Sequence, residues 1–452
     1  MQKTMEIDMT KGRPFNVIVR FAIPIIIGNF FQFLYSIADS VIVGKLMGTE
    51  ALAAVGSTTV IIYAVQNFIM GITNGFGIRL GHAFGGKDYS AMRKSAAASI
   101  VLSVIFSAVI TFACCFFTNG ILSLMNVSTE LYSLTYDYLF IVFLGSGATF
   151  FYNMAASIMR ALGNSKLPLI CLLLSSILNI VLDLIFMIPL DMGVAGAALA
   201  FVAAQLASAI LCIIAALKNF TVLRLTSSDF ADIGSEMKTQ LGVCVPMGLQ
   251  MSVMCIGSIA IQSLVNSIGT AAVAGYAAAS KVDRISSYVN DAMISAVYSY
   301  MSQNFGARRL DRIKEGLRVS LFQIELISMV LSVIILLLKH PIVYMFLSSP
   351  SAEIIHYSDI YITYTVPFYF LMGLLSVYRP TIQSMNNTAV PFLACMTELA
   401  TRLAVSILLP QFIGYLSVGI ASPIAWSFAS AILIPVYYRT VHIAGNSKRA
   451  LR

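Results

Sequence analysis

The chain has 452 residues, of which 58% are hydrophobic and only 11% are charged, and its formal net charge is +8. A soluble globular protein carries about 25% charged residues, so this composition excludes a water-facing surface over most of the chain. The basic residues are scattered between apolar segments, which indicates membrane topology rather than nucleic-acid binding, and no segment remains for a sizeable soluble domain.

The apolar segments predict an all-α polytopic membrane protein of about 12 transmembrane helices. Each segment is long enough to cross about 30 Å of hydrocarbon, and the short connections carry Gly, Pro, Asn or charged residues. In chain order, we predict spans at 15–44, 51–79, 93–118, 130–152, 167–189, 193–217, 238–268, 272–303, 315–338, 354–378, 389–410 and 416–438.

Lysine and arginine residues gather on one side of this predicted topology. If the N-terminus is inside, the outside segments hold only Lys45 and Lys339. Cytoplasmic loops are enriched in Lys and Arg, so we expect both termini to be cytoplasmic.

The sequence repeats itself once. Residues 48–53 match 269–274 at an offset of 221, Lys87 matches Arg308 at the same offset, and 162–168 match 385–391 at an offset of 223. The repeat predicts two six-helix lobes, 1–217 and 238–452, joined by a cytoplasmic linker at 218–237. An even number of helices per lobe makes the lobes parallel, with a pseudo-twofold axis along the membrane normal.

Ionisable residues inside a membrane are costly, so each is a candidate functional residue. Asp39 and Asp183 have no basic neighbour in their predicted spans. Asn179 lies one helical turn before Asp183, and Gln32 lies two turns before Asp39. Two carboxylates with amide companions predict a site for a proton or a small hard cation such as Na⁺. The alternative is that these residues only hold helices together.

The second half does not repeat this site. By the repeat offsets, Asp39 corresponds to Ala260, Asn179 to Arg402 and Asp183 to Ser406. Glu398 and Arg402 are four residues apart, and we expect them to pair with each other. A denser charged group in one helix is expected either to pair internally or to contact anionic substrate groups; it comprises Lys281, Asp283, Arg284 and Asp291.

Signals for an enzyme are missing from the sequence. There is no GxxxxGK[ST] phosphate-binding loop, which predicts that ATP does not drive transport through this chain, and there is no HExxH motif. An intramembrane enzyme would need paired acidic metal-binding motifs, and Asp229 and Asp232 lack that spacing. We therefore expect neither a catalytic residue nor a cofactor, and no metal apart from a possible coupling Na⁺ at Asp39, Asp183 and Asn179.

Three motifs resemble the multidrug and toxic compound extrusion (MATE) family along essentially the whole chain. They are ADSVIVG at 38–44 running on to ALAAVG at 51–56, FGGK at 84–87, and RALGNSKLP at 160–168. The resemblance implies two six-helix lobes in a V shape and a cavity that opens to one side at a time. It also implies export of cationic and amphipathic compounds against a proton or sodium gradient.

Within that family the chain resembles the DinF-like branch, in which the first lobe holds the coupling carboxylates. Gln32, Asp39, Asn179 and Asp183 match its cation-site positions, whereas 251–257 and 361–379 lack the acids of the branch that couples through the second lobe. We therefore predict a monomeric H⁺ or Na⁺ antiporter in a bacterial or archaeal plasma membrane. The alternative is a flippase for lipid-linked precursors. We assign the substrate cavity to Tyr35, Asn153, Lys281, Arg284 and Arg402.

Overall fold

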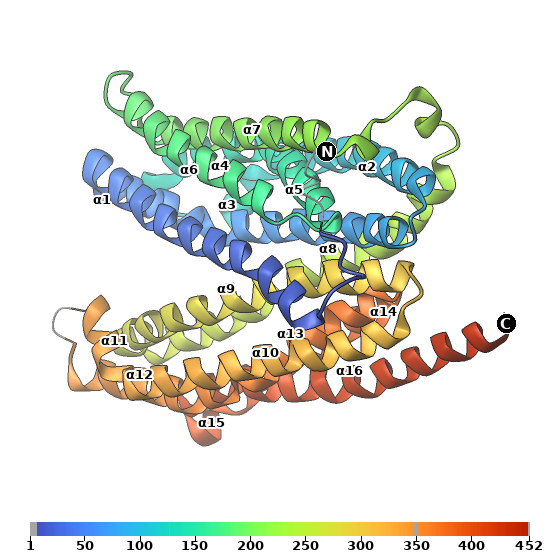
Figure 1. Ribbon diagram of the computed structural model, residues 1–452. Helices are drawn as coiled ribbons and strands as arrows, with labels where there is room; N and C mark the ends of the chain where they lie inside the picture. Colours follow the sequence, from blue (N-terminus) through green and yellow to red (C-terminus); the bar gives the residue numbers. More distant parts are fainter. Residues whose placement is uncertain (1–6, 126, 348–349, 451–452) are drawn as a thin grey trace. The chain divides into compact units, whose positions relative to one another are not determined.

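The computed structural model describes residues 7–125, 127–347 and 350–450, and all regular structure in these ranges is helical (Figure 1). The side chains at 36, 38–41, 49, 52, 346 and 447–450 lie outside the description. The helices of the first half are α1 (Pro14–Gly85), α2 (Tyr89–Phe116), α3 (Thr118–Leu124), α4 (Thr129–Leu144), α5 (Ser146–Ala161), α6 (Lys166–Met187) and α7 (Gly193–Asn219).

Two short 3₁₀ turns, η1 (Thr221–Leu223) and η2 (Ser227–Phe230), lead to the second half. Its helices are α8 (Gly234–Ile268), α9 (Thr270–Gly306), α10 (Leu310–Leu337), α11 (Lys339–Phe346), α12 (Ala352–Thr365), η3 (Val366–Phe368), α13 (Tyr369–Ser384), α14 (Ala389–Leu408), α15 (Pro410–Ile413) and α16 (Leu416–Ala450).

These helices confirm the all-helical membrane class. In the described residues, ten helical segments are long and apolar enough to span a membrane. The pair α4 and α5, bent by 42° at Gly145, would be an eleventh span. The polar α9 is long enough for a twelfth, but its charged residues make it less apolar. The boundary predicted between spans 15–44 and 51–79 is present in α1, where the non-helical backbone of Gly48 (φ 82°) separates two helices.

The chain divides into two compact units that do not follow the repeat boundary. Unit 1 contains residues 1–8 and 23–248, and unit 2 contains 9–22 and 249–452. The first turns of α1 therefore belong to unit 2, and the first turns of α8 belong to unit 1. Arg312 of α10 fixes the first of these segments, since its guanidinium donates to the carbonyl oxygens of Gly12 (3.0 Å) and Met9 (3.1 Å).

The two halves share their turn geometry at repeat-related positions. Lys87 and Arg308, 221 residues apart, both adopt a left-handed backbone, with φ of 57° and 58°. Gly163 (φ 83°) and Asn386 (φ 65°) are related in the same way at an offset of 223. L-residues rarely adopt this conformation, so its recurrence supports a repeated backbone and not only a repeated sequence.

Small residues bring α1 and the first turns of α8 close together in unit 1. A Cβ atom on Gly71 would lie 2.5 Å from the Met247 carbonyl oxygen, and one on Gly75 would lie 2.5 Å from the Cys244 Cα. The glycines four residues apart therefore allow the backbones to approach each other, as small-residue spacing does in membrane helices.

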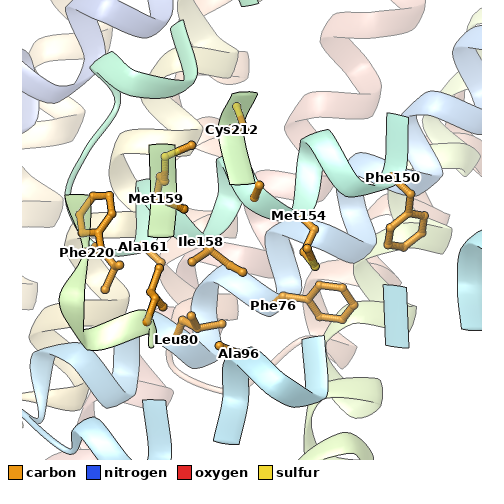
Figure 2. Packing of buried hydrophobic residues seen from close by; sticks show 14 of the residues in the cluster. Phe76, Leu80, Ala96, Phe150, Met154, Ile158, Met159, Ala161, Cys212 and Phe220 are labelled. Carbon is orange, nitrogen blue, oxygen red and sulfur yellow. The ribbon is translucent and has the colours of Figure 1, made fainter. Parts of the chain in front are cut away.

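The core of unit 1 lies beside this contact. Apolar side chains from α1, α2, α5 and α7 interdigitate there, and Figure 2 shows Phe76, Ala96, Met154, Ile158 and Cys212 among them. Phe76, Phe150 and Phe220 are the largest fully buried side chains of this cluster. This packing gives the polar residues of α6 a rigid surrounding unit.

Candidate functional site: a buried carboxylate network in unit 1

One face of α6 is buried and carries the candidate carboxylate. Cys171, Ser175, Asn179, Asp183 and Met187 recur every four residues and are all buried, because positions four apart lie on one side of a helix. This face packs against α7, and the Ser175 hydroxyl donates to the Ala204 carbonyl oxygen at 2.5 Å. The helix thereby fixes Asp183 inside unit 1 with no exposed surface.

A chain of polar contacts joins Asp183 to α1. The Asn179 Nδ2 donates to the Asp183 Oδ2 at 3.0 Å, and the Tyr35 hydroxyl donates to the Asn179 Oδ1. An amide that accepts from a phenol and donates to a carboxylate stabilises the ionised acid. The network therefore links the charge on Asp183 to the position of α1.

The structure unites some of the predicted coupling residues but not all. Asn179 and Asp183 are in direct contact, as the spacing on one helix indicates. Asp39 lies on α1, but its side chain is outside the described residues. Gln32 is exposed, and in the described part of the chain no hydrogen bond joins it to Asn179 or Asp183. The roles of Asp39 and Gln32 remain predictions.

Tyr35 contacts the carboxylate network, although we assigned it to the substrate cavity from sequence. Tyr35 lies four residues before Asp39, on the same face of a helix. That spacing could have placed Tyr35 beside the predicted ion site. Asn153, assigned to the same cavity, donates from its Nδ2 to the Thr149 carbonyl oxygen of its own helix at 2.8 Å, and its role in the cavity remains a prediction.

The charged residues of unit 2 are arranged differently from our expectation. Glu398 does not pair with Arg402; its carboxylate forms a buried ion pair with Arg379 of α13. The prediction was wrong because a residue on a neighbouring helix reached Glu398. Arg402 is buried, whereas Lys281 and Arg284 of α9 are exposed.

Asp283 of α9 accepts hydrogen bonds from two tyrosines. The Tyr361 hydroxyl of α12 donates to Oδ2, and the Tyr369 hydroxyl of α13 donates to Oδ1. The ring of Tyr276 packs edge-on against Tyr361 at a centroid distance of 5.1 Å. Sequence spacing gave no signal for this aromatic cluster, because its members lie on three different helices.

No group of three or more His, Cys, Asp or Glu side chains in the described part of the chain could hold a metal ion. The oxygens of Asp183 and Asn179 are the ligand type that a hard monovalent cation or a proton takes.

Comparison with known proteins agrees with this architecture. A family model described as MatE matches residues 24–185 and 246–408, once in each half of the repeat. The probable multidrug resistance protein YpnP of Bacillus subtilis (strain 168) is 28% identical over 437 residues, covering 96% of each chain. The multidrug export protein MepA of Staphylococcus aureus (strain MSSA476) is 23% identical over 83% of this chain and 82% of that protein.

Solved structures share the fold over almost the whole length. An outward-facing multidrug resistance MATE family transporter superposes with a TM-score of 0.90 at 22% identity, covering 98% of each chain. A MOP superfamily transporter from Pyrococcus furiosus superposes with a TM-score of 0.89 at 22% identity, covering 98% of this chain and 99% of that chain. With two repeated helical halves and a family match over most of its length, this chain belongs to the MatE family of membrane transporters.

Proposed function

We propose that this multidrug export transporter is an antiporter that expels amphipathic or cationic compounds in exchange for H⁺ or Na⁺ through the carboxylate network of unit 1. The observation that carries this proposal is the contact chain from Tyr35 through Asn179 to the fully buried Asp183. The names of YpnP and MepA support drug-like substrates for a member of this family.

The network offers a physical route for coupling. An ion shifts a conformational equilibrium only through its different affinities for the two states. Binding of H⁺ or Na⁺ at Asp183 changes the hydrogen bond that Asn179 donates to this carboxylate. Because the hydroxyl of Tyr35 is hydrogen-bonded to Asn179, the change reaches α1, which carries Tyr35. The ion and the drug then favour opposite-facing states, which is the thermodynamic requirement for exchange.

Coupling is proposed to lie in one lobe only, with Asp39 as the second carboxylate and Gln32 as a polar companion. With this assignment, the chain is proposed to belong to the DinF-like branch. Its support is that 251–257 of α8 and 361–379 of α12 to α13 contain no Asp or Glu. The lobes are proposed as 1–217 and 238–452, with 218–237 as the linker, in a monomer.

Export by two carboxylate variants tests the coupling. Asp39→Asn and Asp183→Asn should reduce drug efflux from cells to the level of cells without the protein, while the purified variants still bind drug. In proteoliposomes, proton and sodium gradients imposed separately identify the ion. Tyr35→Phe keeps the ring and should leave partial transport.

The outcomes separate coupling from folding. Wild-type efflux by both Asn variants would overturn the proposal. Loss of both variants from the membrane would mean that the two acids only hold α1 and α6 in place.

The proposed orientation has both termini in the cytoplasm of a bacterial-type membrane, because the Lys and Arg residues gather on that side. Single cysteines at positions 87 and 308 should resist an impermeant thiol reagent added to intact cells, in a background without native cysteines. Labelling of either position from outside would contradict this orientation.

A further inference from the structure

Arg402 is a buried arginine of unit 2. Its residue exposure is 9%, and its Nε has no hydrogen-bond partner. In the described residues it forms no ion pair within 4.0 Å. A guanidinium stays protonated in proteins, and an unpaired buried charge is strongly destabilising. An anion that accepted a hydrogen bond from the Arg402 Nε would satisfy this donor.

Two acids in the neighbourhood of Arg402 already have partners. Glu398, one turn before Arg402 on α14, is bound to Arg379. Asp283 is within electrostatic range of Arg402, but both of its oxygens accept tyrosine hydroxyls. Arg284 also acts on Asp283, but it acts on Asp291 as well, so its charge is shared between two carboxylates.

The Arg402 side chain packs against a glycine. A Cβ atom on Gly257 of α8 would lie 3.0 Å from the Arg402 Cδ and 3.2 Å from its Nη1. A side chain at position 257 would therefore require the Arg402 side chain to shift by a few tenths of an ångström. The exposed Arg284 and the half-buried Tyr276 and Asp283 carry this polar cluster from Arg402 to the surface of the unit.

We propose that Arg402 binds an oxyanion, namely the carboxylate of an amphipathic transported compound, with Arg284 adding positive charge at the entrance. This inference rests on the proposed export function and assigns a residue that binds the carboxylate of those substrates that carry one. A planar guanidinium can hold a carboxylate through two parallel N–H···O bonds, which a lysine cannot. Arg402 is the repeat counterpart of Asn179, so unit 2 places a positive charge where unit 1 supports a carboxylate.

The test compares two dyes that differ in one group. Rhodamine 110 has a free carboxylate, and rhodamine 123 is its methyl ester. Binding is measured by fluorescence polarisation on purified full-length protein without any ion gradient, so a failure of ion coupling does not affect the result. Arg402→Gln should weaken rhodamine 110 binding at least about tenfold, which is the loss expected for a charge-assisted hydrogen bond.

Matched variants distinguish loss of the carboxylate contact from loss of the fold or of surface charge. Arg402→Lys keeps the charge and should give an intermediate loss, whereas Arg318→Gln removes an exposed charge on α10 and should change neither dye. Binding of rhodamine 123 by Arg402→Gln verifies that the variant is folded. The proposal is wrong if the Arg402→Gln variant binds both dyes as tightly as the wild type does. It is also wrong if the variant loses affinity for both dyes equally while circular dichroism and gel filtration show that it is folded.

Asp283→Asn distinguishes a ligand site from an internal ion pair. Removing this negative charge should leave rhodamine 110 binding unchanged or stronger, because the incoming carboxylate meets less repulsion. A loss as large as that of Arg402→Gln would show that Arg402 serves Asp283 and would overturn the proposal.

A lipid headgroup carries similar chemistry and is tested by competition. Dihexanoyl phosphatidylglycerol and dihexanoyl phosphatidylcholine have equal chain length but differ in net charge. Neither should displace rhodamine 110 selectively. If the glycerol lipid displaces rhodamine 110 and not rhodamine 123, the occupant is an anionic lipid and the substrate assignment is wrong.

Discussion

The two units repeat the same turn geometry, but the buried residues at equivalent positions differ in their charge. Left-handed turns recur at Lys87 and Arg308, and the family match recurs in each half. On α6, Asn179 supports the carboxylate of Asp183; on α14, the counterparts of these residues are Arg402 and Ser406. Turn geometry restricts which residues fit, whereas a buried polar site needs only compatible partners. A repeat can therefore keep its fold while one half changes its chemistry.

The largest expected difference is in export itself. Asp183→Asn should abolish gradient-driven efflux, whereas Ser406→Ala at the repeat-related position should leave it nearly unchanged. The Ser406 hydroxyl is buried without a hydrogen-bond partner in the described structure, so its removal leaves no group unsatisfied. Drug efflux from cells measures both variants. Equal loss of efflux would mean that the two halves couple alike.

A second pair of variants compares how much stability the protein loses when repeat-related positions in the two units are substituted. Glu398→Ala leaves Arg379 buried and unpaired, which should cost about 3–5 kcal/mol. Its repeat counterpart Ser175 makes one hydrogen bond to Ala204, so Ser175→Ala should cost about 1 kcal/mol. Thermal unfolding in detergent measures both. A smaller loss for Glu398→Ala than for Ser175→Ala would contradict the buried ion pair.

The third comparison tests the repeated turn after α5 and α13. At Gly163, φ is 83° and a Cβ atom would lie 2.1 Å from the Ile7 carbonyl oxygen. Gly163→Ala should therefore cost at least about 2 kcal/mol, from both backbone conformation and steric overlap. Asn386 already has a Cβ atom, so Asn386→Ala should cost about 1 kcal/mol or less. Unfolding temperatures that fall equally would show that the steric contact does not matter.

The smallest effect on stability is expected in the linker, for the carboxylate of Asp229 in unit 1. Hydrogen bonds from the Thr226 backbone and hydroxyl, with a further bond from Arg93, lower the pKa of Asp229 below its ordinary value of 3.8. A lowered pKa adds stability above the unfolded-state pKa, and this stability is lost as the pH falls through the lower folded value.

Asp229→Asn should therefore lower the unfolding temperature slightly at about pH 6, with the difference from wild type shrinking below about pH 4. Asp232→Asn, at an exposed position in the same linker, is the control. A difference that grows on acidification would contradict this sign.

Most of the helical plan could be predicted because it depends on local properties, namely apolar length, turn residues and the internal repeat. The kink at Gly48 and the bend at Gly145 also fall at residues that a sequence marks. Contacts between helices were harder to predict from the sequence. Glu398 had a suitable partner one turn away in Arg402, but Arg379 on another helix binds it. The tyrosines on Asp283 come from helices far along the chain, and spacing within one helix carries no information about them.

Each unit contains the first turns of a helix whose remaining turns belong to the other unit. This division has a consequence for how the protein can be assembled. Residues 9–22, which include the first turns of α1, belong to unit 2 and are held partly by Arg312. The first turns of α8 belong to unit 1 and pack against Gly71 and Gly75. Each half of the gene thus encodes a segment that the other half needs. If the two halves were synthesised as separate polypeptides, neither would contain all of its own unit, and a stable product would require both in the same membrane.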